Sequence, residues 1–158
     1  MALTEMMDKY GAEEALRKIF RWGYEMGHKY ALRLGKDLKR YTNIFKDSPF
    51  FGRLGWYLFS GNIPQVEVHV IEIEGYKVLE IFVRDYNCPW CLGFEYSYPI
   101  CSYPCGTYEA GTLTWFMLIG KIDEYCAITR ESKCKARGGP CCKLSVVYSK
   151  RAFNRKVR

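Results

Sequence analysis

The residues in this sequence that are best suited to chemistry are its eight cysteines, which all lie between Cys88 and Cys142. A thiolate can ligate a metal ion, and a reactive thiol can take part in redox exchange. We expect an intracellular chain, in which a local cluster of cysteines favours metal binding over disulfides. Disulfides remain an alternative, because they are common inside the cells of hyperthermophiles.

The second half of this cluster has the spacing Glu131-x2-Cys134-x3-Gly138-x3-Cys142. Glu131 and Cys134 come at the end of a predicted strand, Gly138 allows the chain to turn, and the next strand begins at the cysteine pair. A hairpin of this size can bring Cys134 and Cys142 to one ion, with Glu131 as a third ligand. Cys141 could take the place of Cys142. A structural zinc site is four-coordinate, so one further ligand is required.

The first half of the cluster offers candidates for that ligand in the segments Cys88-x2-Cys91 and Cys101-x3-Cys105. Either Cys101 or Cys105 could complete the site. Alternatively, these four thiols could form a second, separate four-thiolate site. The spacing of Cys88 and Cys91 is also that of a thiol oxidoreductase, but the βαβ context that such a motif requires is not visible in the sequence.

The N-terminal third of the chain predicts helices. A first helix is expected over residues 12–34, where Gly23 and Gly27 lie one turn apart on one face and indicate a close packing contact. A second helical region, residues 37–59, is expected to break into two pieces near Pro49.

The rest of the chain predicts two β-hairpins with a helix between them. Alternating, β-branched residues form the first hairpin around the turn at Glu74-Gly75, with Val66, Val68 and Val70 facing the core. The remaining elements are a helix over residues 106–119 and strands over 122–134 and 143–148. Strands joined by short turns favour an antiparallel sheet of four strands with helices on one side, which is an α+β fold.

In this arrangement the chain resembles the 4-vinyl-reductase-like family of small-molecule-binding domains. The resemblance is carried by Cys101-x4-Gly106, the apolar helix after it, Glu131-x2-Cys134-x3-Gly138-x3-Cys142, and Gly23-x3-Gly27 in the first helix. The family includes the sensor domains of phenol-responsive bacterial transcription activators, and it shares its overall fold with subunits of the TRAPP trafficking complex. The resemblance implies a zinc site with the ligands Cys101, Glu131, Cys134 and Cys142.

The resemblance also implies a sensory or carrier function, in which a cavity between helices and sheet binds small apolar or aromatic, hydrocarbon-like molecules. The zinc is expected to be structural, because four protein ligands leave no position for an activated water. We expect no enzymatic activity, since the sequence lacks a phosphate loop, a nucleophile elbow and a His-Glu-x-x-His motif. The alternative is a protein-interaction or dimerisation module without a physiological ligand. Candidate wall residues of the cavity are Trp56, Phe59, Trp90, Trp115 and Phe116.

Length and composition suit one domain, residues 1–149, followed by a basic tail, residues 150–158. The net charge is +7, and all of the excess lies after residue 131, where the sequence has nine Lys or Arg and no Asp or Glu. We interpret the tail as solvated, and we expect no nucleic-acid partner because no recognised motif accompanies it. Because the sequence shows no secretory signal and no membrane span, we expect a cytoplasmic protein. We also expect a homodimer that passes any signal to a separate protein partner.

Overall fold

A four-stranded antiparallel sheet forms one layer of the protein, with the strand order β1-β2-β4-β3. The structure, a computed structural model, describes residues 3–91, 95 and 101–150. Its elements are α1 (Leu3–Tyr10), α2 (Ala12–Arg33), α3 (Gly35–Leu38), α4 (Ile44–Ser60), β1 (Gln65–Ile73), β2 (Tyr76–Asp85), η1 (Pro89–Cys91), α5 (Ser102–Leu118), β3 (Tyr125–Lys133), η2 (Lys135–Arg137) and β4 (Cys142–Lys150). The predicted α+β class and the four strands are confirmed.

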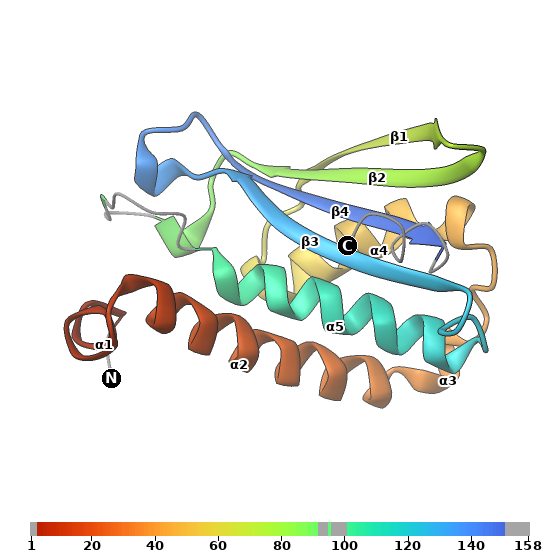
Figure 1. The fold of residues 1–158 in the computed structure, drawn as a ribbon, viewed down its shortest axis with the longest axis horizontal. Helices are drawn as coiled ribbons and strands as arrows, with labels where there is room; N and C mark the ends of the chain where they lie inside the picture. Colours follow the sequence, from red (N-terminus) through yellow and green to blue (C-terminus); the bar gives the residue numbers. More distant parts are fainter. Residues whose placement is uncertain (1–2, 92–94, 96–100, 151–158) are drawn as a thin grey trace.

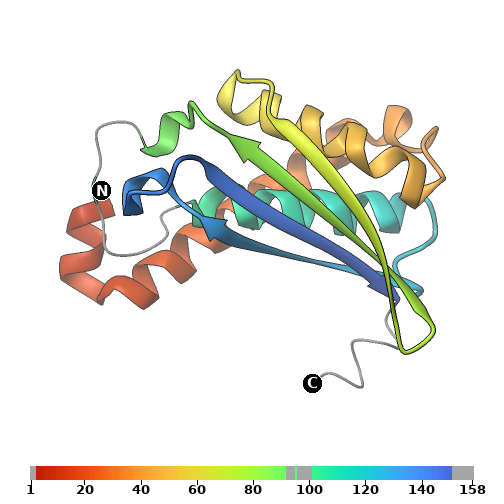
Figure 2. The ribbon, with the colours of Figure 1, turned by 90° about the horizontal axis from the view of Figure 1, so that it is seen from above.

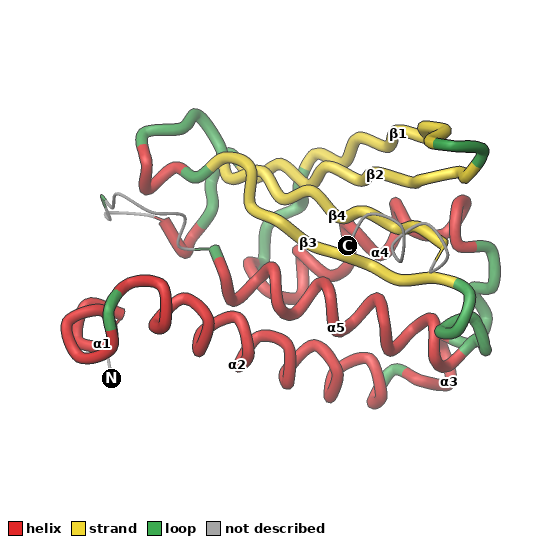
Figure 3. Tube along the Cα trace, viewed as in Figure 1, coloured by secondary structure: helices red, strands yellow, loops and turns green. Residues whose placement is uncertain are grey.

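The helices lie on one face of the sheet in two further layers (Figures 1, 2 and 3). Helix α5 packs under β3 and β4, and α4 packs under β1 and β2. Helix α2 runs along the opposite side of α5, so that α5 is enclosed between α2 and the sheet. This placement explains why α5 is apolar on all sides and buries residues around most of its circumference. Among the described residues, no helix has the length and apolar composition needed to cross a lipid bilayer.

Helices α2 and α5 are in direct backbone contact, as Gly23 and Gly27 predict. A Cβ atom added at Gly23 would lie 2.1 Å from the Tyr103 carbonyl oxygen, and one at Gly27 would lie 2.2 Å from that of Thr107. On the facing helix, a Cβ added at Gly106 would lie 2.0 Å from the Phe20 carbonyl oxygen. Only glycine permits this approach, which fixes α2 against the start of α5.

Replacing Gly27 by alanine is expected to destabilise the protein, because the added methyl group would force α2 away from α5. Overpacking of this kind costs about 1–3 kcal/mol, which lowers the melting temperature of a chain of this size by roughly 2–12 °C. Gly111→Ala is the matched control, since its Cβ would come no closer than 3.9 Å to the Gly27 oxygen. The control should be neutral or slightly stabilising. Equal melting temperatures for the two variants would contradict this account of the interface.

The first hairpin has the predicted strands and turn, but its outer strand is exposed. Glu74 and Gly75 both have positive φ, as a two-residue hairpin turn of this hand requires. Val66, Val68 and Val70 pair with the buried β2 residues Val83, Ile81 and Leu79, so they face the core side of the sheet as predicted. Val66 is half-buried, whereas Val68 and Val70 are exposed. The reason is that β1 is an edge strand and α4 covers only its beginning, where Val66 approaches Gly52.

Two predicted helix boundaries also differ from the structure. Helix α4 continues through Pro49 without a break, and the interruption falls earlier, before the Asn43 cap, whose side chain accepts a hydrogen bond from the Lys46 N–H. Helix α5 begins at Ser102 rather than at residue 106, so Cys101 is its cap residue. The basic tail predicted from residue 150 falls, from residue 151 onward, outside the described residues.

Candidate functional site: a thiol cluster beside an apolar cavity

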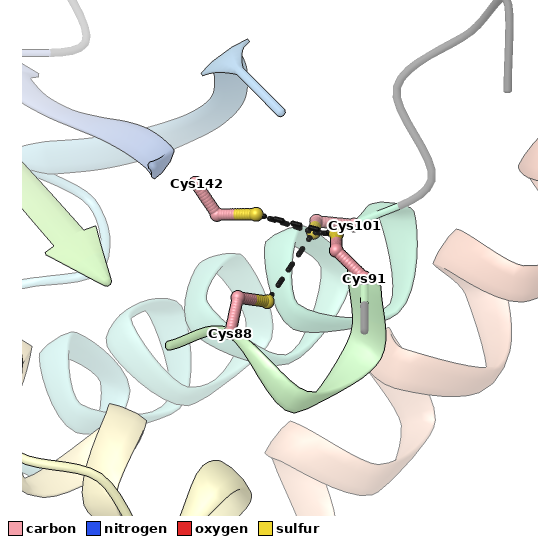
Figure 4. Close-up of side chains that lie close together, drawn as sticks. All are labelled: Cys88, Cys91, Cys101 and Cys142. Atoms are coloured by element: carbon pink, nitrogen blue, oxygen red, sulfur yellow. Dashed lines mark hydrogen bonds between the residues drawn. The ribbon is translucent and has the colours of Figure 1, made fainter. Parts of the chain in front are cut away.

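Five buried cysteine thiols and one carboxylate converge at the end of the sheet where α5 begins. Cys88 and Cys91 come from the η1 turn after β2, Cys101 caps α5, and Cys142 starts β4; Figure 4 shows these four sulfur atoms pointing toward one another. Two sets of four residues have their ligand atoms within 4.8 Å of one another. The first set is Cys88, Cys91, Cys101 and Cys142, and the second is Cys101, Glu131, Cys134 and Cys142.

The sulfur positions fit a tetrahedral metal site. Four sulfurs that each lie about 2.3 Å from a tetrahedral ion are separated by about 3.8 Å. The Sγ atom of Cys101 lies 4.0 Å from that of Cys88, 3.5 Å from that of Cys91 and 3.7 Å from that of Cys142. The Sγ–Sγ distance from Cys91 to Cys142 is 3.3 Å. None of the eight cysteines, which all lie among the described residues, is joined to another by a disulfide.

A β-bulge brings Glu131 and Cys134 to the same side of the chain. In a regular strand, residues three apart point to opposite faces. Here the pairing of β3 with β4 shifts between Glu131 and Lys133, so Ser132 is an extra residue in the ladder. The bulge offsets the alternation by one residue, and Cys134 continues in extended conformation on the face of Glu131. The Glu131-x2-Cys134 motif therefore needs this β-bulge to place both side chains on one face of the strand.

The carboxylate of Glu131 is the strongest sign that a cation belongs in the cluster. Its Oε2 atom accepts a hydrogen bond of 3.0 Å from the Cys101 N–H. Its Oε1 atom is buried and has no hydrogen-bond partner among the described residues. Burial and the neighbouring Cys134 thiol raise the pKa of Glu131 to about 8. A buried oxygen without a donor is costly, and a metal ion would satisfy it.

The thiols also perturb one another. Hydrogen bonds from Cys101 and Cys142 stabilise the thiolate of Cys91 and lower its pKa. The pKa of Cys101 is raised instead, first by Cys134 and then by Cys142. A divalent ion would compensate several thiolates at once, as in protein zinc sites.

The other predicted ligands lie outside this cluster. Among the described residues, Cys105 and Cys141 belong to neither set of four. The structure thus brings Cys142, in place of Cys105, to the side of Cys88 and Cys91. Cys88 is 0% exposed and Cys91 is 5% exposed. Such burial argues against the thiol-oxidoreductase alternative, because a redox thiol has to be reached by its partner.

An apolar cavity of about 300 Å³ lies between α2, α4 and α5 and ends near the thiol cluster. Phe51, Trp115, Tyr108 and Tyr148 form its inner wall, and the Phe51 and Trp115 rings are 4.4 Å apart between centroids. The full lining is Met26, Gly27, Tyr30, Ala31, Leu34, Leu38, Phe51, Leu54, Gly55, Leu58, Trp90, Tyr103, Thr107, Tyr108, Gly111, Thr112, Trp115 and Tyr148.

Two of the five predicted wall residues, Trp90 and Trp115, line this cavity. Trp56 and Phe116 are not part of the lining, and both are fully buried in the core. The side chain of Phe59 lies outside the described part of the structure. Sequence reasoning missed the tyrosines and the small residues of the lining. These residues come from separate helices and from β4, and no local spacing in the sequence marks their meeting.

Three buried residues of the lining, Tyr108, Thr112 and Tyr148, carry hydroxyl groups. The hydroxyl groups of Thr112 and Tyr148 are 3.4 Å apart, and burial raises the pKa of Tyr148 to about 12. The Tyr108 hydroxyl donates to the Gly52 carbonyl oxygen. An apolar pocket with one hydroxyl pair is suited to a flat, largely apolar molecule that carries at most a few polar atoms.

The thiol cluster and the cavity share a wall. Trp90, between Cys88 and Cys91, and Tyr103, two residues after Cys101, both line the cavity. Their rings are 5.6 Å apart between centroids. The same short segments therefore carry thiols that could ligate a metal ion and two aromatic residues of the cavity lining.

Comparisons with known proteins find this fold in solved structures. No model of a protein family matches the chain, and no curated protein matches it. The phenol-responsive sensory domain of the transcription activator PoxR, solved with phenol, is 21% identical with a TM-score of 0.61, over 94% of this chain and 70% of that one. A trafficking protein particle complex subunit 3 from Naegleria fowleri, covalently bound to palmitic acid, is 16% identical with a TM-score of 0.54. The match covers 94% of this chain and 87% of that one. The predicted TRAPP-subunit-like fold is confirmed, while membership of the 4-vinyl-reductase-like family stays a prediction.

Proposed function

We propose that the protein is a cytoplasmic, non-enzymatic domain that binds a small apolar or aromatic molecule and carries a structural zinc site. The observation that carries this proposal is the cavity between α2, α4 and α5. Its volume of about 300 Å³ is roughly twice that of an apolar cavity of about 150 Å³ that accepts benzene. A molecule with one or two rings would fill it. The phenol and palmitic acid in the two similar structures support a ligand of this class.

Zinc is the metal that this set of donors favours. It prefers thiolates, accepts a carboxylate and is tetrahedral in structural sites. Cys101, Glu131, Cys134 and Cys142 would hold it, and the ion would join the start of α5 to the β3–β4 hairpin. The Glu131 Oε1 atom, which is buried without a partner among the described residues, supports this assignment. The protein's own contribution is to orient the ligands and exclude water.

Ligand binding can be tested with phenol, 1-naphthol and palmitic acid as probes, followed by tryptophan fluorescence. We expect saturable binding of at least one ring compound. Binding should change the tryptophan fluorescence, because Trp90 and Trp115 line the cavity. Gly111→Phe should weaken that binding at least tenfold, since it places a ring inside the cavity. Val70→Phe is the control, because Val70 is 58% exposed on β1. Binding that Gly111→Phe leaves unchanged, or no binding of any probe, would contradict the proposal.

A second candidate, an interaction module without a ligand, is favoured by one observation. The edge strand β1 exposes four apolar side chains, which are Val68, Val70, Ile71 and Ile73. These side chains lie on both faces of β1, and the outer backbone edge of this strand, which pairs with no other strand among the described residues, can pair with a second copy. Native mass spectrometry separates the candidates, because an empty dimer supports the interaction module whereas a bound apolar molecule supports the first proposal.

A further inference from the structure

The sulfur of Cys91 lies close to all three thiols of the proposed zinc site. Its Sγ atom is 3.5 Å from that of Cys101, 3.6 Å from that of Cys134 and 3.3 Å from that of Cys142. The Sγ atoms of Cys101 and Cys142 are 3.7 Å apart, and the Cys134 sulfur lies within 4.8 Å of both. Sulfurs that ligate one tetrahedral ion are separated by about 3.8 Å. These four thiols can therefore surround a single ion.

We propose that Cys91 is an alternative fourth ligand of the zinc ion, interchangeable with Glu131, an inference that rests on the zinc of the proposed function. Cys101, Cys134 and Cys142 hold the ion in either form. The fourth position is completed by the Glu131 carboxylate or by the Cys91 thiolate. Both forms combine four anionic ligands with one divalent ion, so the cost of burying charge does not select between them.

The neighbouring thiol of Cys88 is less suited to this position. Its Sγ atom lies 4.0 Å from that of Cys101, which is farther than the Cys91 sulfur lies from any of the three shared ligands. Among the described residues, no set of four contains both Cys88 and Cys134. A site completed by Cys88 would therefore exclude Cys134, although the Cys134 sulfur is 3.6 Å from that of Cys91.

Glu131 keeps a structural role when Cys91 is the ligand. Its Oε2 atom accepts the 3.0 Å hydrogen bond from the Cys101 N–H, so the carboxylate holds the start of α5 without touching the ion. Its Oε1 atom, which has no partner among the described residues, would be satisfied only by direct ligation. One form thus gains a fourth thiolate, a ligand that zinc prefers, and the other gains a satisfied buried oxygen.

The two forms differ in the segments that the ion would join. Cys91 ends the η1 turn, which also contains Trp90 of the cavity lining. With Glu131 as fourth ligand, the ion joins the start of α5 to the β3–β4 hairpin. With Cys91 in its place, the ion also fixes the η1 turn. The identity of the fourth ligand therefore decides whether the cavity wall at Trp90 is held by the metal.

The test compares two double variants of the full-length protein, purified without chelators and assayed for zinc by elemental analysis. Glu131→Gln with Cys88→Ala should keep one zinc ion per chain, because Cys91 completes the site. Glu131→Gln with Cys91→Ala should lose it. Removing a group that only orients a ligand weakens metal affinity about 10–100-fold, so removing the last fourth ligand should weaken it by at least about 100-fold in competition with a chromophoric chelator. The single variants Glu131→Gln and Cys91→Ala should each keep their zinc.

X-ray absorption at the zinc edge keeps the test decisive if the Cys91 double variant fails to fold. The Cys88 double variant should show four sulfur neighbours at about 2.3 Å, whereas Cys91→Ala should show three sulfurs and one oxygen. Cys105 and Cys141 belong to neither set of four among the described residues, so we expect no fourth sulfur from them. Three sulfurs in the Cys88 double variant would overturn the role given to Cys91.

Other outcomes separate this inference from the proposed function. Loss of zinc from Glu131→Gln alone, or equal retention of zinc by the two double variants, would overturn the alternative ligand and keep the zinc of the proposed function. Loss of zinc from Cys91→Ala alone would show that Glu131 does not replace Cys91, which overturns the interchange and the ligand set of the proposed function. A wild type without zinc would overturn the inference and the proposed zinc together.

Discussion

Replacing Cys142 by alanine should destabilise the protein far more than replacing Cys126. Cys142 belongs to both sets of metal ligands and begins β4, so its loss removes an ion and frees the terminal hairpin from α5. Apparent binding free energies of structural zinc are about 10–16 kcal/mol, as large as the total stability of about 5–15 kcal/mol of a typical domain. We therefore expect the melting temperature to fall by at least about 10 °C.

Cys126→Ala is the matched control for this experiment. Cys126 is half-buried on the neighbouring strand β3, and its thiol contacts the carbonyl oxygen and the hydroxyl of Ser149 instead of the cluster. Its replacement should lower the melting temperature by only a few degrees. Thermal unfolding should also shift downward when a chelator is added to the wild type and to the Cys126 variant, but much less in Cys142→Ala. A chelator that has no effect on the wild type would contradict the role given to zinc.

Asp85→Ala is expected to have the second largest effect, because one buried carboxylate serves three donors. Its Oδ2 atom accepts a 2.6 Å hydrogen bond from the Trp56 indole N–H and one of 3.4 Å from the Asn62 amide, and its Oδ1 atom accepts one of 2.8 Å from the Asn87 N–H. Trp56 is 1% exposed, so its N–H would find no replacement. Each buried donor left unsatisfied costs about 1–3 kcal/mol.

The summed loss for Asp85→Ala should be about 3–5 kcal/mol, a decrease in melting temperature of roughly 6–20 °C. Asp85→Asn keeps one acceptor oxygen and should recover part of the loss. Asp37→Ala, at an ion pair with Arg40 that is exposed on both sides, is the control and should change stability by less than about 0.5 kcal/mol. If the Asp85 and Asp37 alanine variants melt alike, this hydrogen-bond network does not hold α4 to β2.

Much of the fold follows from local patterns in the sequence. The alternation in β1 and β2 and the Glu74-Gly75 turn predict the hairpin, because strand period and turn chemistry act over short distances. Gly23 and Gly27 likewise predict the close contact of α2 with another helix. The exposure of Val70 could not be predicted in this way, since it depends on how far α4 extends over the sheet.

The candidate site was less accessible from sequence, since it depends on three-dimensional irregularities. The spacing of Glu131 and Cys134 indicates two ligands, but only the bulge at Ser132 places them on one face. The pairing of β2 with β4, which sets Asp85 opposite Cys142, also brings Cys88 to the cluster. Strand order across the sheet is a non-local property, and this is why the meeting of Cys88 with Cys142 did not emerge from spacing.

The position of Trp90 between two thiols has a thermodynamic consequence. This residue lines the cavity, while Cys88 and Cys91 on either side of it belong to one of the two sets of possible metal ligands. If the ion sets the orientation of this turn, it changes the affinity of the cavity for its ligand by some factor. By linkage, an occupied cavity must change the affinity for the ion by the same factor. The protein would then report on metal supply and on its small molecule together, as a two-input detector.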